Sequence, residues 1–249
     1  MNIKDVSSAQ NPLYKTWLSL LESRGIKNER RALVSGRRVL AELIEQDPTQ
    51  ILEFLLPPGI NEPPVRGVPT YRLTPPLFQS LDVIGTRSTL AIIRAPELES
   101  WEAREPDGLE LIVALSDPSN LGALLRSADA FGARRVILTE ECASPYLPRA
   151  TRAASGSTFR LSLERTGPLA HVSTSHGPIC GLDALGDRIT HYDWPQNVYL
   201  VLGEEGRGLP SRLALTRLRI PMQSQVESLN ATVAASIALF SYRQIWPLS

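Results

Sequence analysis

The stretch Y-L-V-L-G-E-E-G-R-G-L-P, which runs from Tyr199 to Pro210, decides how the rest of the chain is organised. The apolar run Val198 to Leu202, which leads into this stretch, predicts a buried strand, and three glycines follow within six residues. Glycines let a ligand come close to the main chain. A second run, Ile220-Pro221-Met222, opens another loop, which enters an Ala-rich helix that ends near residue 245. We expect the two loops to meet and to form a pocket for a polar small molecule.

Length, composition and charge narrow the class of protein. A chain of 249 residues can hold two domains of ordinary size, and 43% hydrophobic residues supply a core. The 26 basic and 26 acidic residues cancel, which argues against a protein that coats nucleic acid non-specifically. Two cysteines and three scattered histidines form neither a disulfide framework nor a zinc motif. Because no signal peptide or membrane-spanning run is seen, we expect a cytoplasmic protein with no metal and no membrane contact.

The first 96 residues predict a compact α/β domain, followed by an acidic, proline-containing linker at 97–108 and a second domain at 109–249. Residues 3–24 are predicted to be helical because apolar side chains recur there at spacings of three and four. Six cations between residues 24 and 38 indicate a phosphate-contacting patch, with an ordinary solvated surface as the alternative. Short strands are predicted at 32–34, 51–56, 68–73 and 90–94.

The second domain begins with a largely apolar strand, Leu109 to Leu115, and a helix is predicted from about Leu121 to Phe131. Further strands separated by helical connectors predict a parallel sheet covered on both faces, with the site at the strand ends. Taken alone, the polar residues there have ordinary explanations, namely a helix cap, a surface arginine and a solvated carboxylate. An asparagine early in an Ala-rich helix, however, needs a partner if it is buried. These four residues are Asn120, Arg126, Glu205 and Asn230.

Three segments resemble, in order and spacing, the motifs of the SpoU/TrmH family of RNA ribose 2′-O-methyltransferases. Residues 117–132, which begin D-P-S-N-L-G-A-L-L-R-S-A, resemble the first motif. Residues 202–209, L-G-E-E-G-R-G-L, resemble the second motif, and residues 220–230 resemble the third. Residues 152–159 also resemble the family's link between the first two motifs.

The resemblance implies an α/β, parallel-sheet SPOUT fold whose C-terminal part forms a trefoil knot, with S-adenosylmethionine bound in the knotted loops. The first domain is similar, over residues 7–15 and 31–43, to the ribosomal-protein-like substrate-binding domain of many members. A homodimer through the knotted domain is also implied. Val233, Ile237 and Phe240 form an apolar helix face suited to that contact, with ordinary core packing as the alternative. By position, the residues expected at the cofactor are Leu202, Gly203, Ile220, Met222 and Leu229.

The resemblance further implies roles in catalysis. Arg126 is expected to contact the ribose 2′-hydroxyl and the adjacent phosphate, while Asn120 and Glu205 hold its guanidinium. Asn230, assisted by Ser228, is expected to hold the loop or the ribose. Arginine side chains stay protonated in proteins, so stabilisation of the forming alkoxide is physically easier than general-base catalysis. The residues predicted to bind RNA are Arg30, Arg31, Arg37, Arg38 and Arg152.

The chain departs from the family pattern at three places. Ser35 stands where glutamate is frequent and Ser224 where glycine is usual, and both changes bear on RNA contacts. Ala231-Thr232 replaces the common Val-Ser and bears on the cofactor loop. The appended first domain favours ribosomal RNA over transfer RNA as the substrate, by analogy. The rival classes are a non-catalytic RNA-binding or ribosome-assembly factor and a base N-methyltransferase, and the sequence does not specify the nucleotide.

Overall fold

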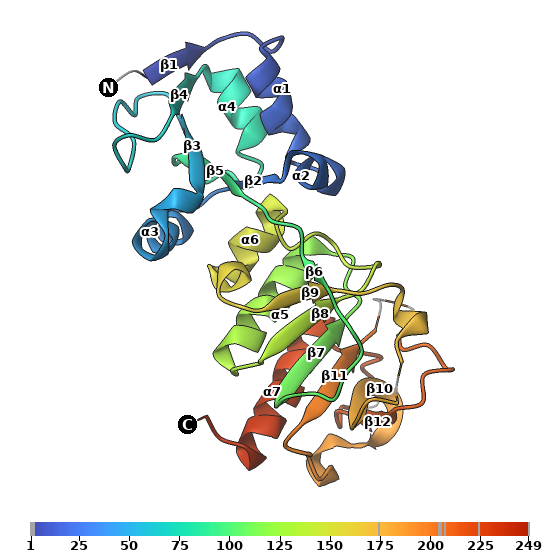
Figure 1. Cartoon of the computed structure of the whole chain (residues 1–249). Coiled ribbons are helices and arrows are strands. Elements are labelled where there is room, and N and C mark those ends of the chain that lie inside the picture. Colours follow the sequence, from blue (N-terminus) through green and yellow to red (C-terminus); the bar gives the residue numbers. More distant parts are fainter. Residues whose placement is uncertain (1–2, 174, 204–205, 207, 224, 249) are drawn as a thin grey trace. The chain divides into compact units, whose positions relative to one another are not determined.

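The computed structural model describes every residue except 1–2, 174, 204–205, 207, 224 and 249 (Figure 1). Residue contacts divide the chain into two compact units. One consists of residues 1–97 and 144–156, and the other of residues 98–143 and 157–249. Each unit has its own sheet with helices packed on it, so the predicted α/β class is confirmed. The domain boundaries at 96 and 109 stay predictions.

The first unit is built on a five-stranded mixed sheet with the order β1-β4-β3-β5-β2. The central strand β3 is almost entirely apolar, as expected for a strand with neighbours on both sides. One face of the sheet packs against Trp17, Leu20, Phe78 and Leu81 from two helices. The strands are β1 (Ile3–Val6), β2 (Arg31–Val34), β3 (Ile51–Leu56), β4 (Thr70–Leu73) and β5 (Leu90–Arg94). The helices are α1 (Pro12–Ser19), α2 (Ser23–Glu29), α3 (Arg37–Gln46), α4 (Pro75–Leu81) and α6 (Pro148–Ala154), with a 3₁₀ turn η1 (Pro48–Gln50).

The prediction of one helix over residues 3–24 is wrong. The first four of these residues form β1, which pairs in parallel with β4, although only Val6 among them is buried. That strand depends on a partner 67 residues away, which no local pattern reveals. The helix itself begins after Asn11, whose side chain accepts a hydrogen bond from the Leu13 N–H at 2.9 Å. The strands predicted at 32–34, 51–56 and 90–94 are confirmed.

The second unit contains a seven-stranded sheet with the order β12-β10-β11-β7-β8-β9-β6, and every described strand pair in it is parallel. The predicted linker at 97–108 contributes a short strand, β6, to this sheet, where it pairs with β9. The trefoil knot implied by the resemblance stays a prediction. The strands are β6 (Glu99–Ser100), β7 (Leu109–Val113), β8 (Arg135–Leu138), β9 (Leu163–Arg165), β10 (Ile179–Arg188), β11 (Val198–Leu202) and β12 (Thr216–Arg219). The helices are α5 (Pro118–Ala130) and α7 (Ala231–Ile245), with 3₁₀ turns η2 (Ser157–Phe159), η3 (Leu169–His171) and η4 (Ile189–His191).

Helices α5 and α7 lie side by side (Figure 1). The ordinary explanation of Asn120, that it caps α5, does not hold, because Asp117 is the cap and accepts the Asn120 N–H at 2.7 Å. Pro118 occupies the first helical position, where its missing N–H costs nothing. Asn230 is the cap of α7 and accepts the N–H groups of Thr232 and Val233. Asn120 and Asn230 therefore both lie at the start of a helix.

Candidate functional site

A cavity of about 740 Å³ lies at the carboxyl edge of the parallel sheet. The strand registers explain why four segments meet there. Leu202 of β11 pairs with Val113 of β7, so both strands end together. In the same way Leu182 of β10 pairs with Leu218 of β12. Because parallel strands deliver their carboxyl ends to one edge, segments distant in the sequence converge on a single site.

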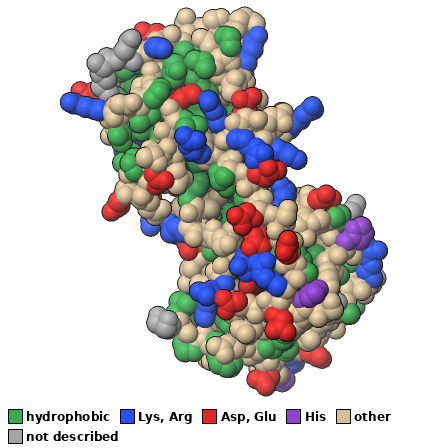
Figure 2. All heavy atoms as spheres, viewed as in Figure 1, with side chains coloured by type: hydrophobic (Ala, Val, Ile, Leu, Met, Phe, Trp, Pro, Cys, Tyr) green, Lys and Arg blue, Asp and Glu red, His purple; other side chains and the backbone are tan. Residues whose placement is uncertain are grey.

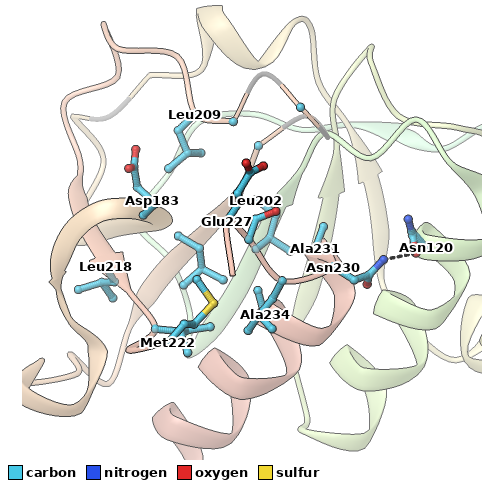
Figure 3. Close-up of a pocket in the computed structure, with 18 residues that line it drawn as sticks. Asn120, Asp183, Leu202, Leu209, Leu218, Met222, Glu227, Asn230, Ala231 and Ala234 are labelled. Atoms are coloured by element: carbon cyan, nitrogen blue, oxygen red, sulfur yellow. Dashed lines mark hydrogen bonds between the residues drawn. The ribbon is translucent and has the colours of Figure 1, made fainter. Parts of the chain in front are cut away.

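The cavity has apolar walls and a few polar groups, which is typical of small-molecule sites of this size. Figure 3 shows Asp183 on one side of the cavity, Asn120 and Asn230 on the opposite side, and Glu227 between them. The lining residues are Asn120, Leu182, Asp183, Ala184, Leu202, Gly203, Gly206, Gly208, Leu209, Leu218, Ile220, Met222, Glu227, Ser228, Leu229, Asn230, Ala231 and Ala234.

At Gly203 the end of β11 lies close to the main chain of Gly208 and Leu209. A Cβ atom on Gly203 would lie 2.3 Å from the Gly208 carbonyl oxygen and 2.8 Å from the Leu209 nitrogen. Gly208 has a φ of +66°, a conformation that favours glycine. The loop thus turns back against the end of β11, and only glycine leaves room for that return.

A set of hydrogen bonds joins the starts of α5 and α7 at one side of the cavity. The Asn230 Nδ2 donates to Asn120 Oδ1 at 3.0 Å, as the dashed line in Figure 3 shows. The Thr232 hydroxyl donates to the Asn120 carbonyl oxygen at 2.9 Å. Asn230 is exposed and caps the helix, so burial does not demand a partner for it, but its side chain still donates to Asn120.

The structure brings together most of the residues that the sequence singled out. All five residues predicted at the cofactor line the cavity, as do Asn120, Ser228 and Asn230. Arg126 does not: it is an exposed residue of α5, six positions beyond Asn120, which corresponds to about 9 Å along the helix axis. In the described part of the chain no hydrogen bond joins Arg126 to Asn120, whose Oδ1 accepts the Asn230 Nδ2. Glu205 and Ser224 lie outside the described residues.

The arginines predicted to bind RNA fall into two groups. Three of them form ion pairs: Arg30 with Glu97, Arg31 with Glu53 and Arg38 with Glu42. Arg37 and Arg152 are exposed and make no ion pair with any residue in the described part of the chain. Arg152 Nη1 lies 3.3 Å from the position that a Cβ on Gly36 would take. On the face drawn in Figure 2, basic and acidic side chains are interspersed.

The comparisons with known proteins agree with this geometry. The sequence model of the SpoU rRNA Methylase family matches residues 110–240. The chain belongs to this family. The matched range contains β7 through most of α7, and so includes every strand end that reaches the cavity. The predicted resemblance is confirmed.

Individual relatives of this SpoU-family chain extend the match into the first unit. It is 41% identical over 245 residues to ribosomal RNA small subunit methyltransferase G 2 of Syntrophobacter fumaroxidans; the match covers 96% of this chain but 49% of that protein. The chain thus spans about half the length of this relative. It is 28% identical to 23S rRNA (guanosine(2553)-2′-O)-methyltransferase RlmP of Bacillus subtilis, over 97% of this chain and 100% of that one.

A solved structure supports the cofactor prediction. The SpoU methyltransferase AviRb from Streptomyces viridochromogenes, in complex with the cofactor AdoMet, superimposes with a TM-score of 0.79. It is 25% identical to this chain and covers 96% of this chain and 100% of its own. The cavity of this SpoU-family chain fits such a group, because it is large enough for a nucleoside with an amino-acid tail and has apolar walls at Leu202, Ile220 and Met222.

One wall of the cavity was missed by the sequence reasoning. Leu182, Asp183 and Ala184 follow the first part of β10, which lies between β11 and β12. Asp183 forms an ion pair with Arg217, which also donates to the Pro210 carbonyl oxygen at 3.0 Å. A hydrogen bond from the Leu185 N–H and the guanidinium of Arg217 lower the pKa of Asp183, so it carries a charge at neutral pH. A carboxylate directly after a buried strand was the available signal.

The two cysteines do not line the cavity and are unreactive at neutral pH. Burial raises the pKa of the Cys142 and Cys180 thiols to about 12, so neither is a nucleophilic thiolate at neutral pH. Among the residues that the structure describes, no group of three or more histidine, cysteine or acidic side chains could hold a metal ion. No helix in the described part of the chain is long and apolar enough to span a membrane.

Proposed function

We propose that the chain transfers the methyl group of S-adenosylmethionine to a ribose 2′-hydroxyl of ribosomal RNA. When bound, S-adenosylmethionine supplies a methyl group already activated by its sulfonium, and the protein has to hold and orient the acceptor. The observation that carries the proposal is the convergence of Asn120 and Asn230 at the rim of a cavity to which all three motif segments of the SpoU family contribute lining residues.

One set of residues would bind the cofactor, and another would orient the ribose. Leu202, Ile220 and Met222 would hold the flat adenine by apolar contact, and the main chain at Gly203 would approach it closely. Asn120, fixed by Asn230 and by the Thr232 hydroxyl, would orient the ribose. We propose that Arg126 closes over the acceptor when RNA is bound and stabilises the alkoxide that forms as the 2′-hydroxyl loses its proton.

RNA contacts are proposed for two of the five arginines. Arg30, Arg31 and Arg38 each have a carboxylate partner, whereas Arg37 and Arg152 have none among the described residues. Helix α3 has no acidic residue in its first turn and no side-chain cap, so its start carries partial positive charge. A guanidinium held against Gly36 at that start is unfavourable unless an anion binds there. An RNA phosphate fits that requirement.

Methyl transfer is tested with ribosomal RNA from a strain that lacks the gene. The wild-type protein should transfer one labelled methyl group per RNA, and mass spectrometry of the digest should find a 2′-O-methylated nucleoside. Arg126→Ala should abolish transfer and leave the Kd for S-adenosylmethionine within about threefold, since Arg126 lies outside the cavity lining. Methylation of transfer RNA alone, methylation of a base, or RNA binding without transfer would each refute the proposal and identify the rival that replaces it.

The RNA contacts are tested by salt dependence. Arg37→Ala and Arg152→Ala should each weaken RNA binding and reduce the slope of log K against log salt concentration by about 1, because each removes one phosphate contact. Arg30→Ala is the matched control, since Arg30 is already paired with Glu97. An equal change of slope in all three variants would show that an ion pair does not keep an arginine from binding RNA, and would refute the choice of Arg37 and Arg152.

We also propose a homodimer that buries one face of α7. Val233, Ile237 and Phe240 are 49%, 36% and 53% exposed, so packing in the core of this chain does not account for them. Phe240→Glu should convert a dimer to a monomer in sedimentation, because it places a charge in an apolar interface. An unchanged sedimentation coefficient would show that this face of α7 does not form the dimer interface.

The cytoplasmic location stays a prediction.

A further inference from the structure

A polar seam joins α5 to α7, and we define it as the contacts among Asn120, Ser127, Thr232 and Ser236. At its upper rung, near the cavity, the Thr232 hydroxyl donates to the Asn120 carbonyl oxygen at 2.9 Å. At its lower rung, one turn further along α7, the hydroxyls of Ser127 and Ser236 lie 2.8 Å apart. Ser236 Oγ also donates to the Thr232 carbonyl oxygen at 2.8 Å. Since Ser236 has a single hydroxyl proton, Ser127 is the donor in the lower rung.

Thr232 closes a ring of contacts at the upper rung. Its N–H donates to Asn230 Oδ1 at 2.9 Å, Asn230 Nδ2 donates to Asn120 Oδ1 at 3.0 Å, and the Thr232 hydroxyl returns to the Asn120 main chain. Thr232 is buried at 8% exposure and is not itself a lining residue of the cavity. The ring therefore fixes both the main chain and the side chain of Asn120 relative to the start of α7.

We propose that Thr232 is a positioning residue for methyl transfer, acting through its hydroxyl on Asn120. The inference rests on the proposed function, and it assigns a specific task to a position where this chain carries threonine. The Thr232 hydroxyl makes the hydrogen bond to α5, whereas the Thr232 N–H bond to Asn230 is a main-chain contact that any residue except proline would keep. A hydroxyl is thus required at this position, whereas the methyl group is not.

The test compares three variants of the full chain. Thr232→Val keeps the shape of the side chain and removes the hydroxyl; Thr232→Ser keeps the hydroxyl and removes the methyl. Ser236→Ala is the matched control, because it removes the lower rung of the same seam without touching Asn120. For each variant we would measure kcat and KM for ribosomal RNA, the Kd for S-adenosylmethionine by calorimetry, and the Tm.

Thr232→Val should lower kcat by about three- to tenfold, the range that the loss of one hydrogen bond represents. Its Kd for S-adenosylmethionine should stay within about twofold, since the apolar walls of the cavity are unchanged. Thr232→Ser should restore the wild-type kcat. Ser236→Ala should lower the Tm at least as much as Thr232→Val while leaving kcat unchanged.

Three results would overturn the inference: an unchanged kcat in Thr232→Val, a Thr232→Ser variant as slow as Thr232→Val, or an equal loss of kcat in Ser236→Ala. In each of them the wild-type protein still methylates RNA, so the proposed function survives. If the wild-type protein binds S-adenosylmethionine but transfers no methyl group, the proposed function and this inference fail together.

Discussion

Replacing Gly203 with alanine should push the main chain at Gly203 away from the main chain at Gly208 and Leu209. The added Cβ would lie 2.3 Å from the Gly208 carbonyl oxygen and 2.4 Å from its carbonyl carbon. A comfortable contact between such atoms is about 3.5 Å, so the return segment has to move by roughly 1 Å. Neither contact is the end of a flexible side chain, so main chain has to shift.

Overpacking of this kind costs about 1–3 kcal/mol. Gly203, Gly208 and Leu209 all line the cavity, so the shift changes its shape directly. If this whole cost weakens cofactor binding, the Kd for S-adenosylmethionine should rise by about 5- to 150-fold, since every 1.4 kcal/mol is tenfold. Any share of the cost that destabilises the protein without cofactor would lower the Tm instead.

Calorimetric titration with S-adenosylmethionine measures the change in Kd, and a thermal melt measures the change in Tm. Gly167→Ala is the matched control, because a Cβ there would meet nothing within 4 Å and its φ lies outside the left-handed region. We expect that control to match the wild type in Kd and Tm. A Gly203→Ala variant with a Kd within twofold of wild type and an unchanged Tm would refute the steric reasoning.

Three further predictions concern charges and thiols. Asp183→Asn should raise the Kd for S-adenosylmethionine by about two- to fivefold in calorimetry, because a partly exposed ion pair with Arg217 orders one wall of the cavity. Arg31→Met should lower the Tm without changing the salt slope of RNA binding, because it removes the ion-pair partner of the buried Glu53 carboxylate, whose other hydrogen bond in the described part of the chain comes from the Trp17 indole N–H. Because burial raises the pKa of Cys180 from 9.0 to about 12, the unfolded chain releases this proton first, and the free energy of unfolding measured in urea should fall as the pH rises from about 9 towards 12.

The cavity could be predicted from the sequence because its main loops are marked by residues with strict conformational requirements. Gly203 permits a close return of the chain, and the segment after Ile220 begins with a proline. The start of α5 was misplaced by three residues, although the Asp117-Pro118 pair is a typical cap and first position. Reading that pair would have placed Asn120 in the first turn.

The parts that could not be predicted depend on pairings between distant segments. Strand β1 has one buried residue and is held by β4, and β10 reaches the cavity only because it lies between β11 and β12. No local pattern in either strand specifies its neighbour. The partners of the arginines were equally hidden, since Glu97 lies 67 residues from Arg30 and Glu53 lies 22 residues from Arg31.

The grouping of residues 144–156 with the first unit affects how the protein can be divided. The chain crosses between the units three times, and α6 buries Ala150, Thr151 and Ala154. A fragment that starts at residue 98 would keep α6 but lose β2, the strand with which it makes contact. Its apolar side would then be open to solvent and prone to self-association. Expression of the second unit alone therefore calls for a polar loop in place of residues 144–156, and no single cut yields two complete units.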